Sequence, residues 1–366
     1  MVVELEHPFP SFLNLLCHPI FSPVHQQTDL LHPNWSSEQG KRFVCNGPFC
    51  LEKRSSSEFS LIKNTIYWDH PSVHLQSIKI IKADAQLALE LFQANQIDWL
   101  GRPIYPWYPF FNRISIEKHV SPFISIYWLV LNTKKFPFNC REIRQAFALA
   151  TDQVKLLKDL NDIGEPAYTP LTKLHTLHKD SKALAYSPQK ALKLFEAGLK
   201  KLGISRLSFP TLSLPCANNS FRKQIAEHIK QNLSEVLHIN IEIELYDWPA
   251  YFKKLCEGDF LMGGMSWCSW IDDPSYTLQS FTEGERKTNF SKWENSTFNT
   301  LVNEGISEAD PYKRMEYWRK AESLLIENVP VNLSFGFFRL QSSENCPFRK
   351  GLKMASFLDG YRQLIR

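Results

Sequence analysis

Apolar residues recur every three or four positions in several stretches of the chain, a spacing that predicts helices with one buried face. The longest such stretch is 220–237, where the predicted buried face consists of Phe221, Ile225, Ile229, Leu233 and Val236. Shorter stretches predict helices over 85–95, 187–198 and 312–327. Each of these helices needs a neighbouring element against which its apolar face can pack.

Polar residues next to prolines mark the starts of several predicted helices. An aspartate followed closely by a proline is typical of a helix start, because the carboxylate caps the first backbone N–H groups and proline fits the first turn. This pattern predicts helix starts at Asp247 and Asp310. Ser187, directly before Pro188, predicts a third.

The stretch 127–152 contains the fullest set of local signals. It predicts a strand from Tyr127 to Asn132, a turn at Pro137 and then a helix. Asn139 is placed to cap that helix, and Glu142 three residues later would complete a capping box. The predicted inner face of the helix consists of Ile143, Phe147 and Ala150.

Strands are predicted between the helices. From residue 239 to 245, isoleucine or leucine alternates with polar residues, which predicts a half-buried strand. Further strands are predicted over 42–53, 58–63, 76–82, 207–214 and 333–340. Beyond residue 125 strands and helices alternate regularly, as in an α/β domain.

Composition narrows the class of protein. The chain has 366 residues and 43% hydrophobic content, enough for one large or two ordinary domains. Its net charge of +4 is small and spread out, which does not indicate a nucleic-acid partner. No run of about 18 apolar residues exists to span a membrane. The aromatic share of 13%, with ten tryptophans, is typical of a large core or of a ligand cleft lined with rings.

Cysteines and histidines do not predict a metal site. The eight cysteines are scattered without a C-x-x-C pair, so we expect no zinc site and mostly free, buried thiols. His175 and His178 are expected in a solvated loop. An enzyme could use Asp272 with Asp273, or Cys268 with a histidine. Adjacent carboxylates diverge, however, and no histidine is near Cys268 in sequence, so catalysis is not predicted.

Five segments carry recognisable patterns in a fixed order. They are FVCNGPFCL at 43–51, KNTIYW at 63–68, DAQLALELFQANQIDWLG at 84–101, the stretch 131–152, and WPAYFKKLCEGDFLMGGMSWCSWIDDP at 248–274. In this order they resemble segments of the solute-binding components of peptide-importing ABC transporters, the extracellular solute-binding protein family 5. Each segment alone is weak evidence, but five in register over nearly the whole chain make the resemblance specific.

The resemblance implies a type II periplasmic-binding-protein-like fold, an α/β two-lobe architecture of mixed sheets flanked by helices. It assigns 1–125 plus 337–366 to a partial first lobe and 126–336 to the second αβ lobe. Met1 aligns well inside a full-length member, so we expect an N-terminally truncated chain lacking roughly a third of such a protein. Members are periplasmic, although the first residues of this chain show no signal peptide.

The resemblance also implies a function. The chain would capture short peptides between its lobes, as a monomer and without a cofactor or catalysis, and deliver them to an ABC permease and its ATPases. The tryptophans are expected to line one cleft. The residues expected to contact ligand are Trp128, Arg222, Trp248, Ser266, Trp267, Cys268, Trp270 and Asp272.

Individual residues qualify this expectation. Arg222 matches a position where relatives place a cation near the peptide carboxylate, with a plain surface role as the alternative. Trp248 has a core role as its alternative. Trp270 stands where peptide binders commonly carry an aspartate for the ligand α-ammonium, and Gly264 where some carry a buried arginine. Asp272 or Asp273 could replace that aspartate, or could only order the Asp-Pro turn.

Two further expectations follow from these departures. We expect weak or absent peptide binding by the isolated chain. Some relatives bridge the cysteine at Cys268 to one on the opposing strand, but the matching position here is Ser125, so that bridge cannot form. A non-functional or repurposed fragment, and a binder of a metal chelate, haem or glycan, remain the alternative functions.

Overall fold

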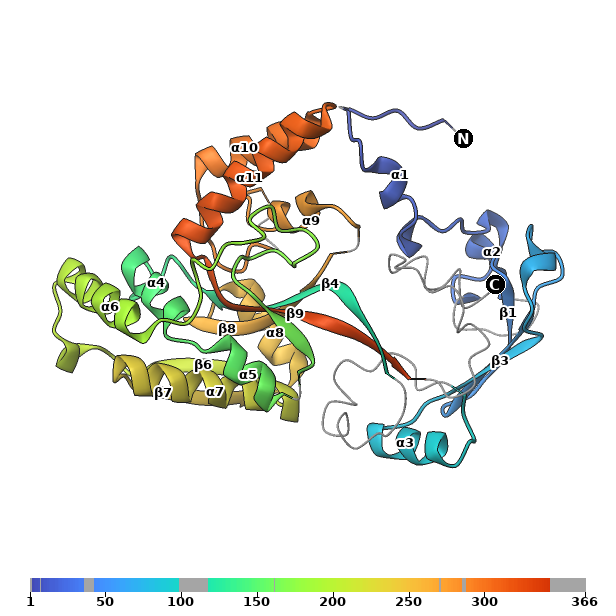
Figure 1. Ribbon diagram of the computed structural model, residues 1–366. Helices are drawn as coiled ribbons and strands as arrows, with labels where there is room; N and C mark the ends of the chain where they lie inside the picture. Colours follow the sequence, from blue (N-terminus) through green and yellow to red (C-terminus); the bar gives the residue numbers. More distant parts are fainter. Residues whose placement is uncertain are drawn as a thin grey trace. The chain divides into compact units, whose positions relative to one another are not determined.

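The computed structural model describes residues 2–6, 8–35, 43–98, 118–160, 162–269, 271–284 and 288–342. The chain divides into two units, shown in Figure 1. The larger contains Val120–Leu340 together with Met1–Phe12, and the smaller contains residues 13–98. Among the described residues, no helix has the length and apolar character needed to cross a bilayer.

The smaller unit is built on a three-stranded antiparallel sheet in the order β1-β2-β3. Its strands are β1 (Phe49–Arg54), β2 (Glu58–Lys63) and β3 (Ser77–Ile81), and its helices include α2 (Gln26–Leu31) and α3 (Ala85–Gln93), with the short α1 (Phe12–Leu15) at its start. The predicted bounds of β2 are confirmed. Leu89 and Phe92 are buried on α3, as their spacing predicts.

The larger unit contains a four-stranded sheet in the order β5-β9-β4-β8. Its strands are β4 (Lys118–Leu131), β5 (Gly164–Ala167), β8 (Met262–Cys268) and β9 (Val331–Ser342). β4 and β8 are antiparallel, with Ile126 opposite Trp267 and Leu129 opposite Gly264. Because side chains alternate along a strand, Trp128 and Leu129 point to opposite faces of this pair.

A second, parallel pair of strands forms a β-α-β unit. Strand β6 (Leu212–Ala217) pairs with β7 (Ile241–Tyr246), and α7 (Ser220–Leu237) connects them and packs on both, as Figure 1 shows. The predicted bounds of α7 and its buried face are confirmed. Helix α8 (Trp248–Glu257) follows β7 directly, and the Asp247 side chain caps it as predicted.

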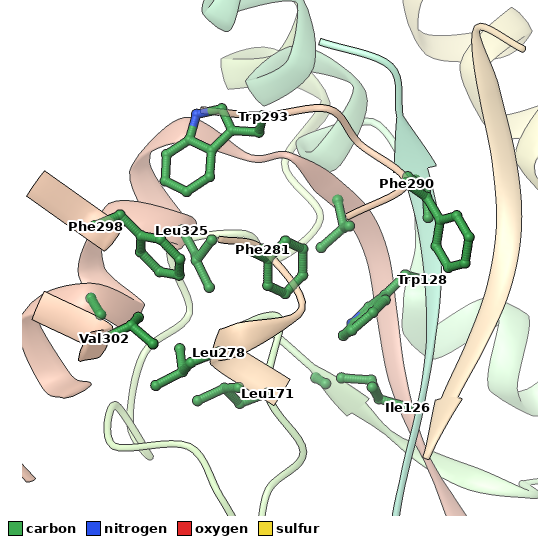
Figure 2. Close-up of a cluster of buried hydrophobic side chains, with 14 of the residues drawn as sticks. Ile126, Trp128, Leu171, Leu278, Phe281, Phe290, Trp293, Phe298, Val302 and Leu325 are labelled. Carbon is green, nitrogen blue, oxygen red and sulfur yellow. The ribbon is translucent and has the colours of Figure 1, made fainter. Parts of the chain in front are cut away.

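The main core of the larger unit lies between β4 and three helices, α9 (Pro274–Gln279), α10 (Ser296–Ser307) and α11 (Pro311–Asn328). Figure 2 shows the Trp128 and Phe281 rings side by side in this core, and their centroids are 5.1 Å apart. Asp310 caps α11 as predicted, accepting from two backbone N–H groups. This core fixes the face of β4 that carries Trp128.

The helix after β4 begins later than predicted. Helix α4 (Arg141–Leu149) has Cys140 as its N-cap with no side-chain cap bond, so the proposed capping box of Asn139 and Glu142 is wrong. The later start moves Glu142 away from the third helical position, and its carboxylate instead lies 3.0 Å from Lys201 Nζ. The predicted inner face of Ile143, Phe147 and Ala150 is confirmed. A further helix, α5 (Gln153–Asp159), follows.

Other predicted boundaries also differ. Helix α6 (Pro188–Leu202) starts at Ser187 as predicted but continues through Gly198 to a left-handed cap at Gly203. Gly198 serves packing, because a Cβ there would lie 2.6 Å from Ile143 Cδ1 on α4. The strand predicted over 207–214 begins at 212, since a capping box between Ser205 and Ser208 starts a short 3-10 turn. Strands β1 and β7 also begin later than predicted.

The Glu142–Lys201 pair gives a pH-dependent prediction. Burial alone would raise the pKa of Glu142, but bonds from its own backbone N–H, Lys201 and Cys140 lower the pKa to about 2. A lowered pKa stabilises the fold above the ordinary value of 4.5, and this stabilisation is lost as the pH falls toward 2. Glu142→Gln should therefore lower the free energy of unfolding by about 1 kcal/mol at pH 7.

Urea denaturation at a series of pH values measures this difference. It should shrink between pH 4.5 and pH 2, the interval between the ordinary pKa of Glu142 and its pKa in the fold. Lys201→Met should match the pH 7 loss, whereas the exposed neighbour Lys200→Met should not. A loss that is independent of pH, or equal in both lysine variants, would contradict the assignment.

Candidate functional site

Arg222 and Trp248 meet because each follows a strand of the parallel pair. Asn219 caps α7 and accepts from the Arg222 backbone N–H at 2.8 Å, which places Arg222 in the first turn after β6. Trp248 is the first residue of α8, directly after β7. Carboxyl ends of parallel strands share one edge, the usual position of ligands in α/β sheets. The Arg222 guanidinium carbon lies 4.9 Å from the Trp248 ring centroid.

The Arg222 side chain is 91% buried, with 9% of its surface exposed. Its Nη1 donates to the carbonyl oxygen of Gly264 at 3.1 Å, and the Tyr251 hydroxyl donates to the same oxygen at 2.6 Å. Burial raises the pKa of Tyr251 well above its usual value, so the phenol remains a donor. Within the described parts of the chain, no carboxylate forms an ion pair with Arg222. Among the described residues, the guanidinium is therefore a largely buried charge without a counter-charge.

Trp248 is the more exposed residue of the Arg222–Trp248 pair. Its side chain is 45% exposed, so the core alternative is wrong. The Arg222 guanidinium lies over the Trp248 ring, and the ring also stacks on Phe252 with centroids 5.6 Å apart. A partly exposed indole beside a cation offers an apolar surface next to a positive charge.

Gly264 lies against Tyr127 and has no room for a side chain. A Cβ at Gly264 would lie 1.7 Å from the Tyr127 hydroxyl oxygen. The small pocket beside Gly264, lined in part by Tyr127, Tyr251 and Arg222, has room for no more than about one water molecule. This space is filled by packing and does not itself admit a ligand.

Trp128 and Trp267 form a separate pair on the core face. Their rings stack with centroids 5.6 Å apart and an interplanar angle of 17°. Trp128 is 2% exposed and its Nε1 donates to the Pro170 carbonyl oxygen at 3.0 Å. Trp267 is half-buried and donates to the Thr277 hydroxyl. The structure thus brings Trp128 to Trp267 and Arg222 to Trp248, with Trp128 inside the core.

Ser266 and Cys268 lie at the end of β8, the edge strand of its sheet. Cys268 is directly opposite Ser125, which confirms that serine occupies the position where a bridging cysteine would stand. The Ser125 hydroxyl donates to the Trp267 carbonyl oxygen at 3.0 Å, so that carbonyl points toward β4. Backbone groups alternate in direction along a strand, so those of Gly264, Ser266 and Cys268 point toward the outer edge.

The described cysteines are all unbridged. Only Cys140 and Cys216 are fully buried, and Cys17 is exposed. The expectation of mostly buried thiols is therefore wrong, because the remaining described cysteines lie at partly exposed positions. No group of three or more metal-ligating side chains occurs in the part of the chain that the structure describes.

The two aspartates after β8 have different roles. Asp273 caps α9, accepting from the Ser275 N–H at 2.9 Å and from the Ser11 hydroxyl, so it orders the Asp-Pro turn. Asp272 is 65% exposed, and its Oδ1 lies 2.9 Å from His175 Nε2. This hydrogen bond lowers the pKa of the Asp272 carboxyl. Trp270 lies outside the described residues.

The buried position of His175 was not predicted from the sequence. The ring is 3% exposed, so the prediction of a solvated position is wrong. Its Nε2 forms the hydrogen bond that holds the Asp272 carboxylate. Its segment lacks a periodic pattern because it is a loop whose burial comes from distant elements. The neighbouring Thr176 hydroxyl and Leu177 N–H both donate to the buried Glu322 carboxylate of α11, at 2.6 and 2.8 Å. These hydrogen bonds to Glu322 hold the loop that contains His175.

The fold is the α/β architecture of the type II periplasmic binding proteins. Residues 1–289 match the model of the bacterial extracellular solute-binding proteins, family 5, and the chain belongs to this family.

Individual relatives agree with this placement. The chain is 29% identical over 341 residues to the oligopeptide-binding protein OppA of Bacillus subtilis, and 26% identical over 339 residues to DppE, a dipeptide-binding protein of the same organism. Each match covers 90% of this chain, and 62% and 61% of the relatives. The chain therefore spans about 62% of the length of these two relatives.

Solved structures share the fold. An oligopeptide-binding protein of Borrelia burgdorferi matches with a TM-score of 0.75 at 24% identity, covering 93% of this chain and 68% of that one. OppA of Burkholderia pseudomallei matches with a TM-score of 0.78 at 18% identity, covering 99% and 72%. DppA of Helicobacter pylori, solved in complex with the peptide STSA, gives 0.77 at 21% identity, covering 93% and 67%.

The crowding at Gly264 gives a second prediction. Gly264→Ala places a methyl group against the Tyr127 hydroxyl and should lower the free energy of unfolding by about 1–3 kcal/mol, a typical effect of overpacking. Gly263→Ala on the same strand is the matched control, because its Cβ would approach no atom closer than 3.0 Å. Urea denaturation compares the two. Equal effects would show that the Tyr127 contact does not restrict position 264.

Proposed function

We propose that this chain is the substrate-binding component of a peptide ABC importer and captures short peptides. The proposal is supported by membership of the solute-binding family and by relatives named as oligopeptide- and dipeptide-binding proteins. In this proposal, 126–336 forms one lobe and 1–125 plus 337–366 contributes to the other. The protein acts outside the cytoplasmic membrane as a monomeric binder, not as an enzyme, and passes its ligand to a permease and ATPases.

The observation that carries the proposal is the buried charge of Arg222, which pairs with no carboxylate of the described residues. A buried ion is costly unless a partner compensates it, and one carbonyl oxygen and an indole face compensate a guanidinium only in part. Its position in the first turn of α7 adds the positive end of a helix dipole. A guanidinium binds a carboxylate through a planar pair of hydrogen bonds. The C-terminal carboxylate of a peptide supplies that partner.

The rest of the ligand would lie along the end of β8. The outward backbone groups of Ser266 and Cys268 suit an extended peptide that pairs as an added strand. Asp272 offers an exposed carboxylate, held by His175, to the α-ammonium of the ligand. Trp248 and Trp267 would contact its side chains, whereas the ring of Trp128 acts by supporting Trp267 from the core.

Calorimetry and native mass spectrometry with tri- to pentapeptides test the carboxylate site. Peptides with a free C-terminus should bind at least tenfold more tightly than the same peptides amidated, because amidation removes the charge that Arg222 receives. Arg222→Met should abolish that preference. Lys223→Met, which removes the exposed cation next in sequence, should leave it unchanged.

Two results would contradict the proposal. Equal affinity for free and amidated peptides would remove Arg222 from the recognition site. Stoichiometric uptake of haem with no uptake of any peptide would replace peptide capture with the binding of another solute.

A further inference from the structure

Two half-buried cysteines of the smaller unit lie close together. Cys45 precedes β1 and Cys50 is the second residue of that strand. Their sulfur atoms are 3.9 Å apart, and neither takes part in a disulfide. A disulfide bond is about 2.05 Å long, so an approach of roughly 1.9 Å would join the two sulfurs. Side-chain rotation and a small backbone shift cover a distance of this size.

The surrounding fold holds the pair in place. The Cys45 thiol donates to the Phe49 carbonyl oxygen at 3.4 Å, which turns its side chain toward β1. Between the cysteines, the carbonyl oxygens of Gly47 and Pro48 accept from the side chain and backbone of Asn64, at 2.7 and 2.8 Å. Asn64 is buried. Asn64 therefore holds the loop between the two cysteines, which keeps the ends of the loop close together.

We propose that Cys45 and Cys50 are a redox modification site, at which a disulfide forms when the chain meets a disulfide oxidant such as oxidised glutathione or a thiol–disulfide oxidoreductase. A bacterial extracellular protein encounters such oxidants once it leaves the reducing cytosol. The site lies in the smaller unit, apart from Arg222 and Trp248 in the larger one. The disulfide can thus be tested whether or not the chain captures peptides.

The chemistry is a pair of thiol–disulfide exchanges. Burial, and the neighbouring Cys45 sulfur, raise the pKa of Cys50 to about 11, so Cys50 is held as a thiol and Cys45 is the first attacking sulfur. The Cys45 thiolate attacks oxidised glutathione and releases one glutathione thiolate. Cys50 then loses its proton and attacks the mixed disulfide at Cys45, releasing the second glutathione. The protein loses two electrons and two protons, and the glutathione disulfide gains them.

The bond would close a ring of six residues around the loop that holds Asn64. By the chain-entropy relation, a loop of this length lowers the unfolding equilibrium constant roughly 40-fold. The disulfide should therefore stabilise the smaller unit, in particular the junction of β1 with the turn after β2.

Peptide mapping of the full chain tests the proposal. The reduced protein is incubated with oxidised glutathione, alkylated and digested without reduction. The fragment containing Cys45 and Cys50 should become about 2 Da lighter and lose both alkylation sites together. Cys45→Ser and Cys50→Ser should each prevent this change, and Cys17→Ser, which removes an exposed cysteine outside the pair, should not.

A trivalent arsenical, phenylarsine oxide, gives a second measurement on the reduced wild-type protein, so the test does not depend on the variants folding. Arsenic bridges two adjacent thiols, and it should protect Cys45 and Cys50 from alkylation together. Alkylation of both cysteines under conditions that glutathionylate Cys17 would overturn the proposal. A bridge from Cys45 to any cysteine other than Cys50 would also overturn it.

Discussion

The register of the β4–β8 pair is the constraint on which the rest of the larger unit depends. Placing Ile126 opposite Trp267 puts both tryptophans, Trp128 and Trp267, on the core face, where they stack. The same register leaves the Gly264 carbonyl at the outer edge, where Arg222 and Tyr251 donate to it. A slip of one residue would exchange the two faces of the strand and separate both sets of contacts.

The Gly264 carbonyl connects the strand register to the position of the Arg222 guanidinium. It is a backbone acceptor that positions a guanidinium without neutralising it, so the positive charge is held in one orientation. Replacing the carbonyl by a carboxylate partner would stabilise the free protein but would occupy the cation. In the proposed function, the arrangement gives up some stability in the unliganded chain for a preorganised anion site.

Local sequence signals predicted which helices and strands form, whereas tertiary contacts determine several of their ends. Helix α7 was predicted to its ends because its apolar period and its flanking turns agree. The predicted cap at Asn139 was wrong because α4 starts one residue later, with Cys140 as its N-cap. Gly198 was predicted as a helix end, but it lies inside α6 and packs against α4.

The candidate site divides in the same way. The resemblance to a known family identified Arg222 and Trp248, but nothing in the sequence shows that they share a cation–π contact. The Gly264 carbonyl, the burial of Trp128 and the fixed His175 depend on strand register and on loops closed by distant residues. Such contacts join positions far apart in the chain, where local pattern carries no information.

Side-chain nitrogen NMR of Arg222 tests the central claim most directly. Its guanidinium resonance can be assigned by its loss in Arg222→Lys and followed while a tripeptide is added. The account predicts that this resonance shifts with a free-carboxylate peptide and does not shift with the amidated one. A peptide that binds and perturbs other resonances while leaving the Arg222 guanidinium unchanged would contradict the claim that this buried charge receives the ligand.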